Sequence, residues 1–362
     1  MELSHRSPEF LHIKANAEHN LRKLLHVPDH YHLLFMHGGG HAQFAAAPLN
    51  LTSNSSATAH YYITGTWSHR AAVEAAKYCN ITQKGSEKGW YQPTSLLPED
   101  IPAPETTGQA STPRPAYCYM CSNETVNGIE YFELPDLKML QVPLVVDMSS
   151  DFGTKPIDFD KVDVAFACTP KNMGIPGLTV VIAKKQLLEQ RTAQSITPGI
   201  LDWSLQAEHD CLWNTPATFN VYVTGLVAAW MLEQGGVREM ERRSIEKAEH
   251  LYSFIDSSDG FFATPWENVQ RSRMNVPFQI GGGGGGGRNE ALTEKFIEGA
   301  YARNIVGLNT LTPFGVGEYL RASLYVSVTL EDVIALTDWM KEFQAAEQSR
   351  STYMYMTRHS YM

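Results

Sequence analysis

The sequence contains little of what would place it among secreted, membrane-spanning or disulfide-stabilised proteins. Its 362 residues include five cysteines, and an odd number suits reduced thiols better than a disulfide framework. No stretch approaches the roughly 20 apolar residues of a membrane span, and the N-terminal residues lack the features of a signal peptide. We therefore expect a cytoplasmic protein that does not enter a membrane.

Basic residues are also scarce. Lysine and arginine together number 29 against 39 aspartates and glutamates, which gives a formal net charge of −10. This balance disfavours a nucleic-acid partner and leaves no basic patch for a membrane surface. An anionic substrate would therefore have to be bound by individual arginines. With 43% hydrophobic residues, the chain can bury a large core and is long enough for two domains.

Three motifs that would suggest other chemistry are incomplete. Cys118 and Cys121 form a Cys-x-x-Cys pair, but no second pair completes a zinc site. His37 and His41 have a spacing that aligns side chains only on a helix, and the three glycines between them oppose a helix. The His-Gly-Gly-Gly run also matches the oxyanion element of esterases, which requires a Gly-x-Ser-x-Gly elbow that the chain lacks. We predict neither a metal site nor an esterase.

Lys171 is the most informative residue that is present. It lies in a turn marked by glycine and proline, between two short apolar segments at 162–167 and 178–182 that are typical of buried strands. Burial disfavours the ammonium form of lysine, and a neutral amine can form a Schiff base with a carbonyl group or with pyridoxal phosphate. The alternative is an exposed turn in which Lys171 points into water.

Two further features favour covalent chemistry at Lys171. Asp147 closes another predicted buried strand within 141–150, and sites of α/β proteins form at the carboxyl ends of such strands. A carboxylate there could keep the ring nitrogen of pyridoxal phosphate protonated, although a strand-end aspartate can also cap a helix. The glycines at 38–40 follow an apolar run and precede an alanine-rich helix start, an arrangement that presents backbone N–H groups to a phosphate.

Eight segments, in order, resemble the phosphoserine aminotransferases, which are pyridoxal phosphate enzymes of the aspartate aminotransferase fold type. The segments lie at 3–6, 37–44, 122–129, 145–151, 171–179, 213–219, 271–278 and 320–325. The resemblance implies an α/β protein of fold type I, with a mainly parallel seven-stranded sheet flanked by helices in a large domain and a smaller C-terminal α+β domain. Apolar strands alternate with helical patterns before about residue 243, which independently favours a mainly parallel sheet.

The predicted domains follow from these patterns. We place the large domain at 1–243, the small domain at 244–345 and a flexible tail at 346–362. Within the small domain, 274–280 and 319–326 have the pattern of antiparallel strands. A final helix is expected after the capping box formed by Thr329 and Asp332, and the residues after about 345 look like a loose tail.

The resemblance assigns four residues to the cofactor ring. Lys171 would bind the cofactor covalently and then move a proton between substrate and cofactor. Asp147 would pair with the ring nitrogen, Trp67 would stack on the ring, and Thr125 would hydrogen-bond its phenolic oxygen. Without the resemblance, Trp67 could equally be an ordinary core aromatic residue.

The resemblance also assigns contacts with the cofactor phosphate. Gly40 and His41 would contact it through backbone groups, and Asn214 and Thr215 would reach it from a neighbouring subunit, which implies a homodimer. Pro170 stands where the family usually has a glutamine that contacts the phosphate. Because proline offers neither a side-chain amide nor an N–H group, we expect that contact to be missing.

Three residues are assigned to the substrate, which carries an anion at each end. Arg321 would bind the α-carboxylate in a bidentate manner. His5 and Arg6 would bind the distal phosphate or the side-chain carboxylate of glutamate. Taken alone, either arginine would be an ordinary surface residue.

Other departures from the family concern the distal anion and the chain start. Some members place an arginine where His41 stands, and a His-Arg pair where Phe314 and Gly315 align, so distal binding is expected to be weaker or altered. The family begins with an additional segment that helps to cover the active site, so we expect either a truncated start or a protein that lacks this segment. The run Gly281–Gly287 resembles flexible linker material.

The implied reaction is transamination of 3-phosphohydroxypyruvate with L-glutamate, giving O-phospho-L-serine and 2-oxoglutarate in serine biosynthesis. The 4-phosphohydroxy-L-threonine step of pyridoxine biosynthesis would be a related activity. Two alternatives stay open at this point. One is an aminotransferase of the same fold with a shifted substrate, and the other is a degenerate homologue that acts only as a dimer partner.

Overall fold

The computed structural model describes residues 3–85, 96–101, 114–266, 270–281, 289–308 and 319–359, with only the backbone described for 351–359. The chain separates into two compact units, Met1–Arg242 and Arg243–Met362. The division falls within one long helix, α7 (Gly236–Asp256), one residue before the predicted domain boundary. The departures noted at Phe314, Gly315 and most of the glycine run lie outside the described residues.

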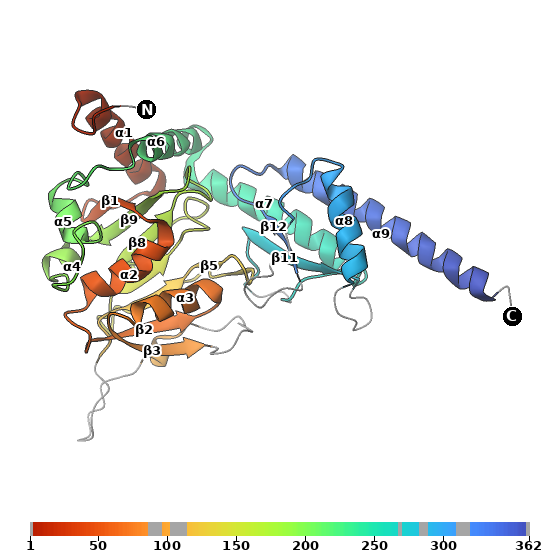
Figure 1. Ribbon diagram of the computed structural model, residues 1–362, viewed down its shortest axis with the longest axis horizontal. Coiled ribbons are helices and arrows are strands. Elements are labelled where there is room, and N and C mark those ends of the chain that lie inside the picture. Colours follow the sequence, from red (N-terminus) through yellow and green to blue (C-terminus); the bar gives the residue numbers. More distant parts are fainter. Residues whose placement is uncertain are drawn as a thin grey trace, which may run out of the picture. The chain divides into compact units, whose positions relative to one another are not determined.

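The first unit is built on a seven-stranded sheet (Figure 1). Its strands lie in the order β1 (Tyr31–His37), β9 (Leu178–Lys184), β8 (Val164–Cys168), β7 (Leu144–Asp147), β4 (Cys118–Cys121), β2 (Thr58–Ile63) and β3 (Asn80–Gly85). β9 runs antiparallel to both of its neighbours, and the remaining pairs are parallel. The predicted fold class, with its mainly parallel sheet, is confirmed.

The central strands are buried on both faces because helices pack against them. All four residues of β4 and of β7 are buried, as expected for a parallel sheet covered on both sides. The helix α2 (Gly39–Leu51) packs against β8 and β9, and α3 (Thr66–Ala75) packs against β2 and β4. The first unit also contains α1 (Pro8–Leu25), α4 (Lys185–Glu189), α5 (Trp203–Glu208), α6 (Thr218–Glu233), the short 3₁₀ helix Pro98–Asp100, and a hairpin of β5 (Asn123–Glu124) and β6 (Ile129–Glu130).

The second unit has its own antiparallel sheet, in the order β10 (Phe262–Ala263), β11 (Asn275–Ile280) and β12 (Leu320–Ser323). The predicted strand pair is confirmed, since β11 and β12 are antiparallel with Pro277 opposite Arg321. In its described residues, this unit contains the second part of α7, α8 (Glu290–Tyr301) and α9 (Leu330–His359). The capping box is also present, because Asp332 accepts from the Thr329 N–H group at 2.8 Å.

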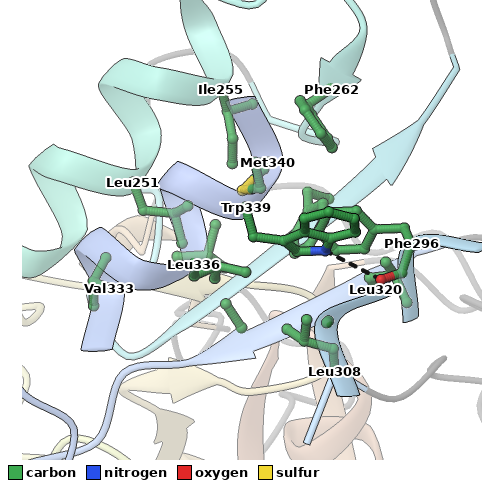
Figure 2. Close-up of a cluster of buried hydrophobic side chains, with 14 of the residues drawn as sticks. Leu251, Ile255, Phe262, Phe296, Leu308, Leu320, Val333, Leu336, Trp339 and Met340 are labelled. Atoms are coloured by element: carbon green, nitrogen blue, oxygen red, sulfur yellow. Dashed lines mark hydrogen bonds between the residues drawn. The ribbon is translucent and has the colours of Figure 1, made fainter. Parts of the chain in front are cut away.

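Aromatic and aliphatic side chains together form the core of the second unit (Figure 2). The indole of Trp339 stacks on the ring of Phe296 with the centroids 5.7 Å apart, and its Nε1 atom donates to the backbone oxygen of Phe296 at 3.2 Å. The Phe262 ring packs edge-on against Phe296, and Leu336 and Met340 of α9 belong to the same cluster. A separate core of this kind allows the second unit to be a domain.

The predicted flexible tail after residue 345 is wrong over most of its length. The helix α9 continues to His359. Its 341–350 segment is rich in glutamate, glutamine, alanine and arginine, which are strong helix formers, and neither glycine nor proline occurs up to the helix end. Arg350 also pairs with Glu347 one turn earlier at 2.8 Å. The low hydrophobicity of the segment suggested a tail, but its helix propensity continues the preceding helix.

No helix in the described ranges is both long enough and apolar enough to cross a membrane. Within the same ranges, histidine, cysteine and carboxylate side chains form no group that could hold a metal ion. Cys118 and Cys121 are both buried, and burial raises the pKa of each thiol well above its ordinary value, which disfavours the thiolate.

Candidate active site

The candidate site lies at one edge of the large sheet. β1, β2, β4, β7 and β8 share one direction, so their carboxyl ends meet at the same edge. The loops at this edge carry the residues predicted to hold the cofactor ring and phosphate: Gly40 and His41 after β1, Trp67 after β2, Thr125 beyond β4, Asp147 at the end of β7, and Lys171 after β8.

Lys171 lies in the turn that joins β8 to β9. Its Nζ atom is 5.8 Å from the centre of the Trp67 ring, within the range of a cation–π contact. Thr169 holds the turn, because its hydroxyl donates to the backbone oxygen of Ile175 at 2.6 Å and its N–H group to that of Leu178 at 3.1 Å. Lys171 is only partly exposed, and it faces an aromatic ring within a closed turn.

Asp147 is almost completely buried, with 4% of its surface exposed. Its carboxylate accepts from the N–H group of Ser149 at 2.9 Å and from the hydroxyl of Tyr119 at 3.3 Å. Burial raises the pKa of the Asp147 carboxyl, against the lowering effect of the Ser149 hydrogen bonds and the Lys171 charge. A carboxylate in this position is stabilised by any cationic group that lies beside it.

Trp67 stands at the start of α3, where three contacts fix its ring. The indole Nε1 atom donates to the hydroxyl of Thr125 at 2.7 Å, and the Trp67 N–H group donates to the carboxylate of Glu124 at 2.8 Å. The imidazole of His41 packs edge-on against the indole, with the ring centres 5.7 Å apart. The hydrogen bond joins two residues that sequence reasoning assigned separately to the cofactor ring.

The glycine turn after β1 opens directly into the helix α2. Gly38 is the N-cap of α2, with a φ of 89°. Residues other than glycine rarely adopt this backbone conformation. Among the residues that the structure describes, none accepts a hydrogen bond from the N–H groups of Gly39, Gly40 or His41. These N–H groups and the helix dipole therefore form an anion-binding end. The expectation that glycines would oppose a helix here is wrong, since α2 begins at Gly39, although His37 still lies on β1 and not on that helix.

Asn214 and Thr215 lie in the segment between α5 and α6. The Asn214 side chain accepts from Gln206 at 3.0 Å, and the backbone oxygen of Thr215 lies 3.1 Å from Nε2 of His37 at the end of β1. Thr215 is exposed, as is the neighbouring Trp213. Their predicted role in a second subunit stays a prediction.

The three residues predicted to bind the substrate lie on other elements. His5 and Arg6 immediately precede α1, where Arg6 is exposed, and Arg321 lies on β12 of the second unit. Their substrate roles stay predictions. Pro170 is exposed beside Lys171 and has no N–H group to offer, and the missing phosphate contact expected there also stays a prediction.

Sequence reasoning missed three residues that shape the site. Tyr119 reaches Asp147 from the adjacent strand β4, and Ser149 binds both Asp147 and the N–H group of Cys168. Glu124 is fully buried and caps α3 by accepting from two backbone N–H groups, those of Trp67 and Ser68, each at 2.8 Å. For Glu124, the sequence does contain an indication: the polar run at 122–125 follows an apolar strand, and sites of α/β proteins form at the carboxyl ends of such strands.

The chemistry of these groups fits pyridoxal phosphate. The N–H groups at the start of α2 suit a phosphate dianion, and the buried Asp147 carboxylate suits a protonated ring nitrogen. The Trp67 indole offers a flat face, the Thr125 hydroxyl a hydrogen bond, and Lys171 a primary amine for a carbonyl carbon. Together these groups supply a partner for each functional part of the cofactor.

A family model for class-V aminotransferases matches residues 1–336 of the chain. The chain belongs to the class-V aminotransferases. This family depends on pyridoxal phosphate, so the predicted aminotransferase is confirmed at the level of the class.

The chain is similar in sequence to phosphoserine aminotransferases. The chain is 41% identical over 344 residues to a phosphoserine aminotransferase from Burkholderia vietnamiensis, covering 95% of this chain and 89% of that protein. It is 38% identical to a probable phosphoserine aminotransferase from Caenorhabditis elegans, covering 95% of this chain and 88% of that protein. The predicted resemblance to phosphoserine aminotransferases is therefore confirmed.

Solved structures of such aminotransferases share the fold. The phosphoserine aminotransferase from Bacillus circulans subsp. alkalophilus superimposes with a TM-score of 0.84 at 30% identity, covering 96% of this chain and 90% of that one. The phosphoserine aminotransferase from Trichomonas vaginalis with bound pyridoxal phosphate gives a TM-score of 0.80 at 33% identity, covering 94% of this chain and 90% of that one.

Proposed function

We propose that this chain is a phosphoserine aminotransferase that transfers an amino group from L-glutamate to 3-phosphohydroxypyruvate, with pyridoxal phosphate bound through Lys171. The observation that carries the proposal is the convergence of Lys171, Trp67 and Asp147 from three different strand ends. The identity of about 40% to phosphoserine aminotransferases over 95% of the chain supports the substrate pair. A cytoplasmic location remains part of this proposal.

Each residue of the cluster has one task in this reaction. When bound, pyridoxal phosphate supplies an electron sink for the carbanion that forms at the substrate Cα atom. Lys171 would hold the cofactor through its Nζ atom, and once the substrate amine has displaced it, the free amine would move a proton between the substrate Cα and the cofactor C4′ atoms. Asp147 holds a proton on the ring nitrogen, because its buried carboxylate is stabilised by an adjacent cation.

The other residues orient the reacting groups. Trp67 fixes the plane of the ring, and its own plane is fixed by the hydrogen bond to Thr125. The first N–H groups of α2 hold the phosphate and so set the distance from the helix to the ring. Arg321, His5 and Arg6 are proposed to bind the two anionic ends of the substrate.

The test of this function uses Lys171→Ala and Lys171→Arg. Wild-type protein mixed with pyridoxal phosphate should develop a shifted cofactor absorbance, and borohydride should fix the cofactor covalently on Lys171. Both variants should lose turnover by at least about 1,000-fold. The control is Lys184→Ala, which removes a lysine at the far end of β9, where it pairs with Asp163, and should keep wild-type turnover. A Lys171→Ala variant with full turnover would contradict the proposal.

The acceptor is tested separately. Turnover should be much faster with 3-phosphohydroxypyruvate than with its unphosphorylated analogue, because a distal phosphate adds charge-assisted hydrogen bonds. Equal turnover would favour the shifted-substrate alternative. Failure to convert pyridoxal phosphate to its amine form with glutamate in a single turnover would favour a degenerate homologue.

We also propose that the protein is a homodimer. On α6, Phe219, Tyr222, Leu226 and Trp230 are 49%, 38%, 52% and 39% exposed. Their spacing places them on one side of the helix, while the buried Val221, Gly225 and Ala228 lie on the other, against α1. An exposed stripe of this kind suits a protein interface. The stripe follows closely after Asn214 and Thr215, which are proposed to act in the other subunit.

A further inference from the structure

A buried charge cluster lies beside the proposed cofactor residues without belonging to them. Lys155 is 7% exposed, and Glu130 and Asp151 are 1% exposed. The Lys155 Nζ atom lies 2.9 Å from Glu130 Oε1 and 2.8 Å from Asp151 Oδ2, and it donates to the backbone oxygen of Tyr131 at 2.9 Å. Burial alone would lower the pKa of Lys155, but the charges of Asp151 and Glu130 outweigh it and raise that pKa. Lys155 is therefore a permanent buried cation.

The cluster is linked to Asp147 through Ser122. The Ser122 hydroxyl lies 2.6 Å from Asp151 Oδ1 and 3.1 Å from the backbone oxygen of Asp147. The Ser122 N–H group donates to the same backbone oxygen at 2.9 Å. Lys155, Asp151, Ser122 and Asp147 therefore form one continuous buried chain of contacts.

A second branch reaches the residue beside Lys171. Ser150 donates through its hydroxyl to the backbone oxygen of Asn123 and accepts from the Asn123 side chain, each at 2.8 Å. The Asn172 side chain donates to the backbone oxygen of Ser150 at 2.9 Å. The loops that follow β4, β7 and β8 are thus joined by buried hydrogen bonds, and Asn172 is the next residue after Lys171.

The contribution of this cluster to folding stability does not by itself explain its presence. Three charges are buried, and two of them have the same sign. Replacing buried ion clusters with apolar residues is often neutral or stabilising, whereas removing one partner is strongly destabilising. Asp151 also acts on the proposed ring-nitrogen ligand, because its charge raises the pKa of the Asp147 carboxyl. A cation beside Asp151 opposes this effect on Asp147.

We propose that Lys155 is a positioning residue for the cofactor: it neutralises Asp151 and, through Ser122, holds the end of β7 that carries Asp147. This rests on the proposed function, in which Asp147 binds the ring nitrogen. Lys155 does not touch the cofactor itself. The charged or titratable groups that act on Asp147 are Lys171, Asp151, Tyr119, Cys121 and Glu124, and Lys155 is paired with Asp151 among them.

The experiment uses the full chain with and without pyridoxal phosphate. Three quantities are measured for each variant: the melting temperature without cofactor, the Kd for pyridoxal phosphate from quenching of tryptophan fluorescence, and kcat. Lys155→Met should weaken cofactor binding by about 10-fold or more and lower kcat. Adding Asp151→Asn to it removes one of the two carboxylates left without a cation, the one that contacts Ser122, while keeping an oxygen for Ser122, and should recover most of the affinity.

Ser122→Ala keeps the test decisive if Lys155→Met does not fold. It leaves all charges in place and removes only the hydroxyl link, so it should weaken cofactor binding by about 3-fold to 10-fold. Lys184→Met is the matched control, because it also removes an ion-pair lysine of the same unit, at the opposite end of the sheet.

The outcomes separate this proposal from the function on which it rests. If wild-type protein fails to bind pyridoxal phosphate, the proposed function itself is wrong. If wild-type protein binds it and Lys155→Met or Ser122→Ala changes only the melting temperature, the cluster is structural and the positioning role is wrong. A double variant that binds no better than Lys155→Met would also overturn the electrostatic part of the proposal.

Discussion

At the scale of single residues, the buried carboxylate of Asp147 lowers the stability of the cofactor-free protein and favours binding of a cationic group. Its carboxylate accepts from the Ser149 N–H group and the Tyr119 hydroxyl, but these contacts do not replace the hydration that burial removes. Burial raises its pKa as a result. Ionised Asp147 therefore lowers the stability of the cofactor-free fold. A cation placed beside the carboxylate offsets this desolvation cost, so the buried carboxylate binds a cation strongly.

This balance predicts the effect of Asp147→Asn on stability. The folded protein holds the carboxyl proton to a higher pH than the unfolded chain does, so the stability contribution of this group is present below its ordinary pKa of 3.8 and is lost as the pH rises through the folded value. At pH 7 the cofactor-free Asp147→Asn variant should be more stable than wild type by on the order of 1 kcal/mol. Urea unfolding at pH 7 and at low pH measures this difference.

The control for that experiment is Asp160→Asn, which changes an exposed aspartate of the same unit and should leave stability unchanged. The Asp147→Asn advantage should disappear at low pH, where both states carry a proton on the carboxyl. A variant that is less stable than wild type at pH 7 would show that the carboxylate is well satisfied without a cofactor.

Residue identity explains which parts of the site could be predicted. Lys171 and Asp147 stand at the ends of apolar segments, so strand periodicity and the strand-end rule locate them. Tyr119 and Lys155 could not be found in this way. Tyr119 reaches Asp147 because β4 lies next to β7 in the sheet. Lys155 is paired with Glu130, which lies on the β5–β6 hairpin, 25 positions earlier in the chain. Strand order and loop packing bring together residues that are far apart in the sequence, so they cannot be predicted from residue spacing.

At the scale of elements, the packing of α1 against α6 depends on one glycine. A Cβ atom at Gly225 would lie 2.9 Å from the Cβ atom of Ala17, closer than two carbon atoms can approach. Asn20 strengthens the same contact, because its side chain donates to the backbone oxygen of Gly225 at 3.3 Å. The absence of a side chain at Gly225 therefore allows the close approach of the two helices at this position.

Gly225→Ala is predicted to destabilise the protein in spite of its helix propensity. Alanine is favoured over glycine in a helix by about 1 kcal/mol, but overpacking at a close contact costs about 1–3 kcal/mol. We expect a net loss in thermal unfolding. The double variant Ala17→Gly with Gly225→Ala moves the methyl group to the other helix and should recover part of the loss. A stabilised single variant would show that the helices separate at little cost.

The helix elements also show where sequence reasoning was limited. One of the helical patterns expected before about residue 243 is α6, whose buried residues recur at helical spacing. The predicted tail failed because hydrophobic pattern and helix propensity disagree after residue 345, and propensity prevails in α9. Glu347 also pairs with Lys295 of α8 at 3.7 Å, a contact between helices that spacing along the chain does not predict.

At the scale of the whole molecule, the proposed dimer predicts a concentration-dependent assembly. Leu226→Asp together with Trp230→Asp places two charges on the exposed stripe of α6, and burying them in an interface would be unfavourable. Sedimentation should show a dimer for wild type and a monomer, or a dimer weakened by about 100-fold or more, for the variant. Cofactor affinity should fall with it, because Asn214 and Thr215 are proposed to act across the interface.

The matched control for the dimer is Val73→Asp. Val73 is 55% exposed on α3, so the substitution adds a charge to a helix surface away from α6. It should leave sedimentation unchanged. A wild-type protein that is monomeric at all concentrations would contradict the proposed homodimer.

The order of the site residues along the chain has a consequence for biosynthesis. The residues proposed to hold the cofactor within their own subunit lie between Gly40 and Lys171, and the sheet that positions them is complete at Lys184. Arg321, the proposed ligand of the substrate carboxylate, belongs to the second unit. A nascent chain released from the ribosome as far as Arg242 would therefore contain the cofactor pocket before the substrate arginine has been synthesised. Cofactor capture during translation would stabilise the first unit while the second is still being made.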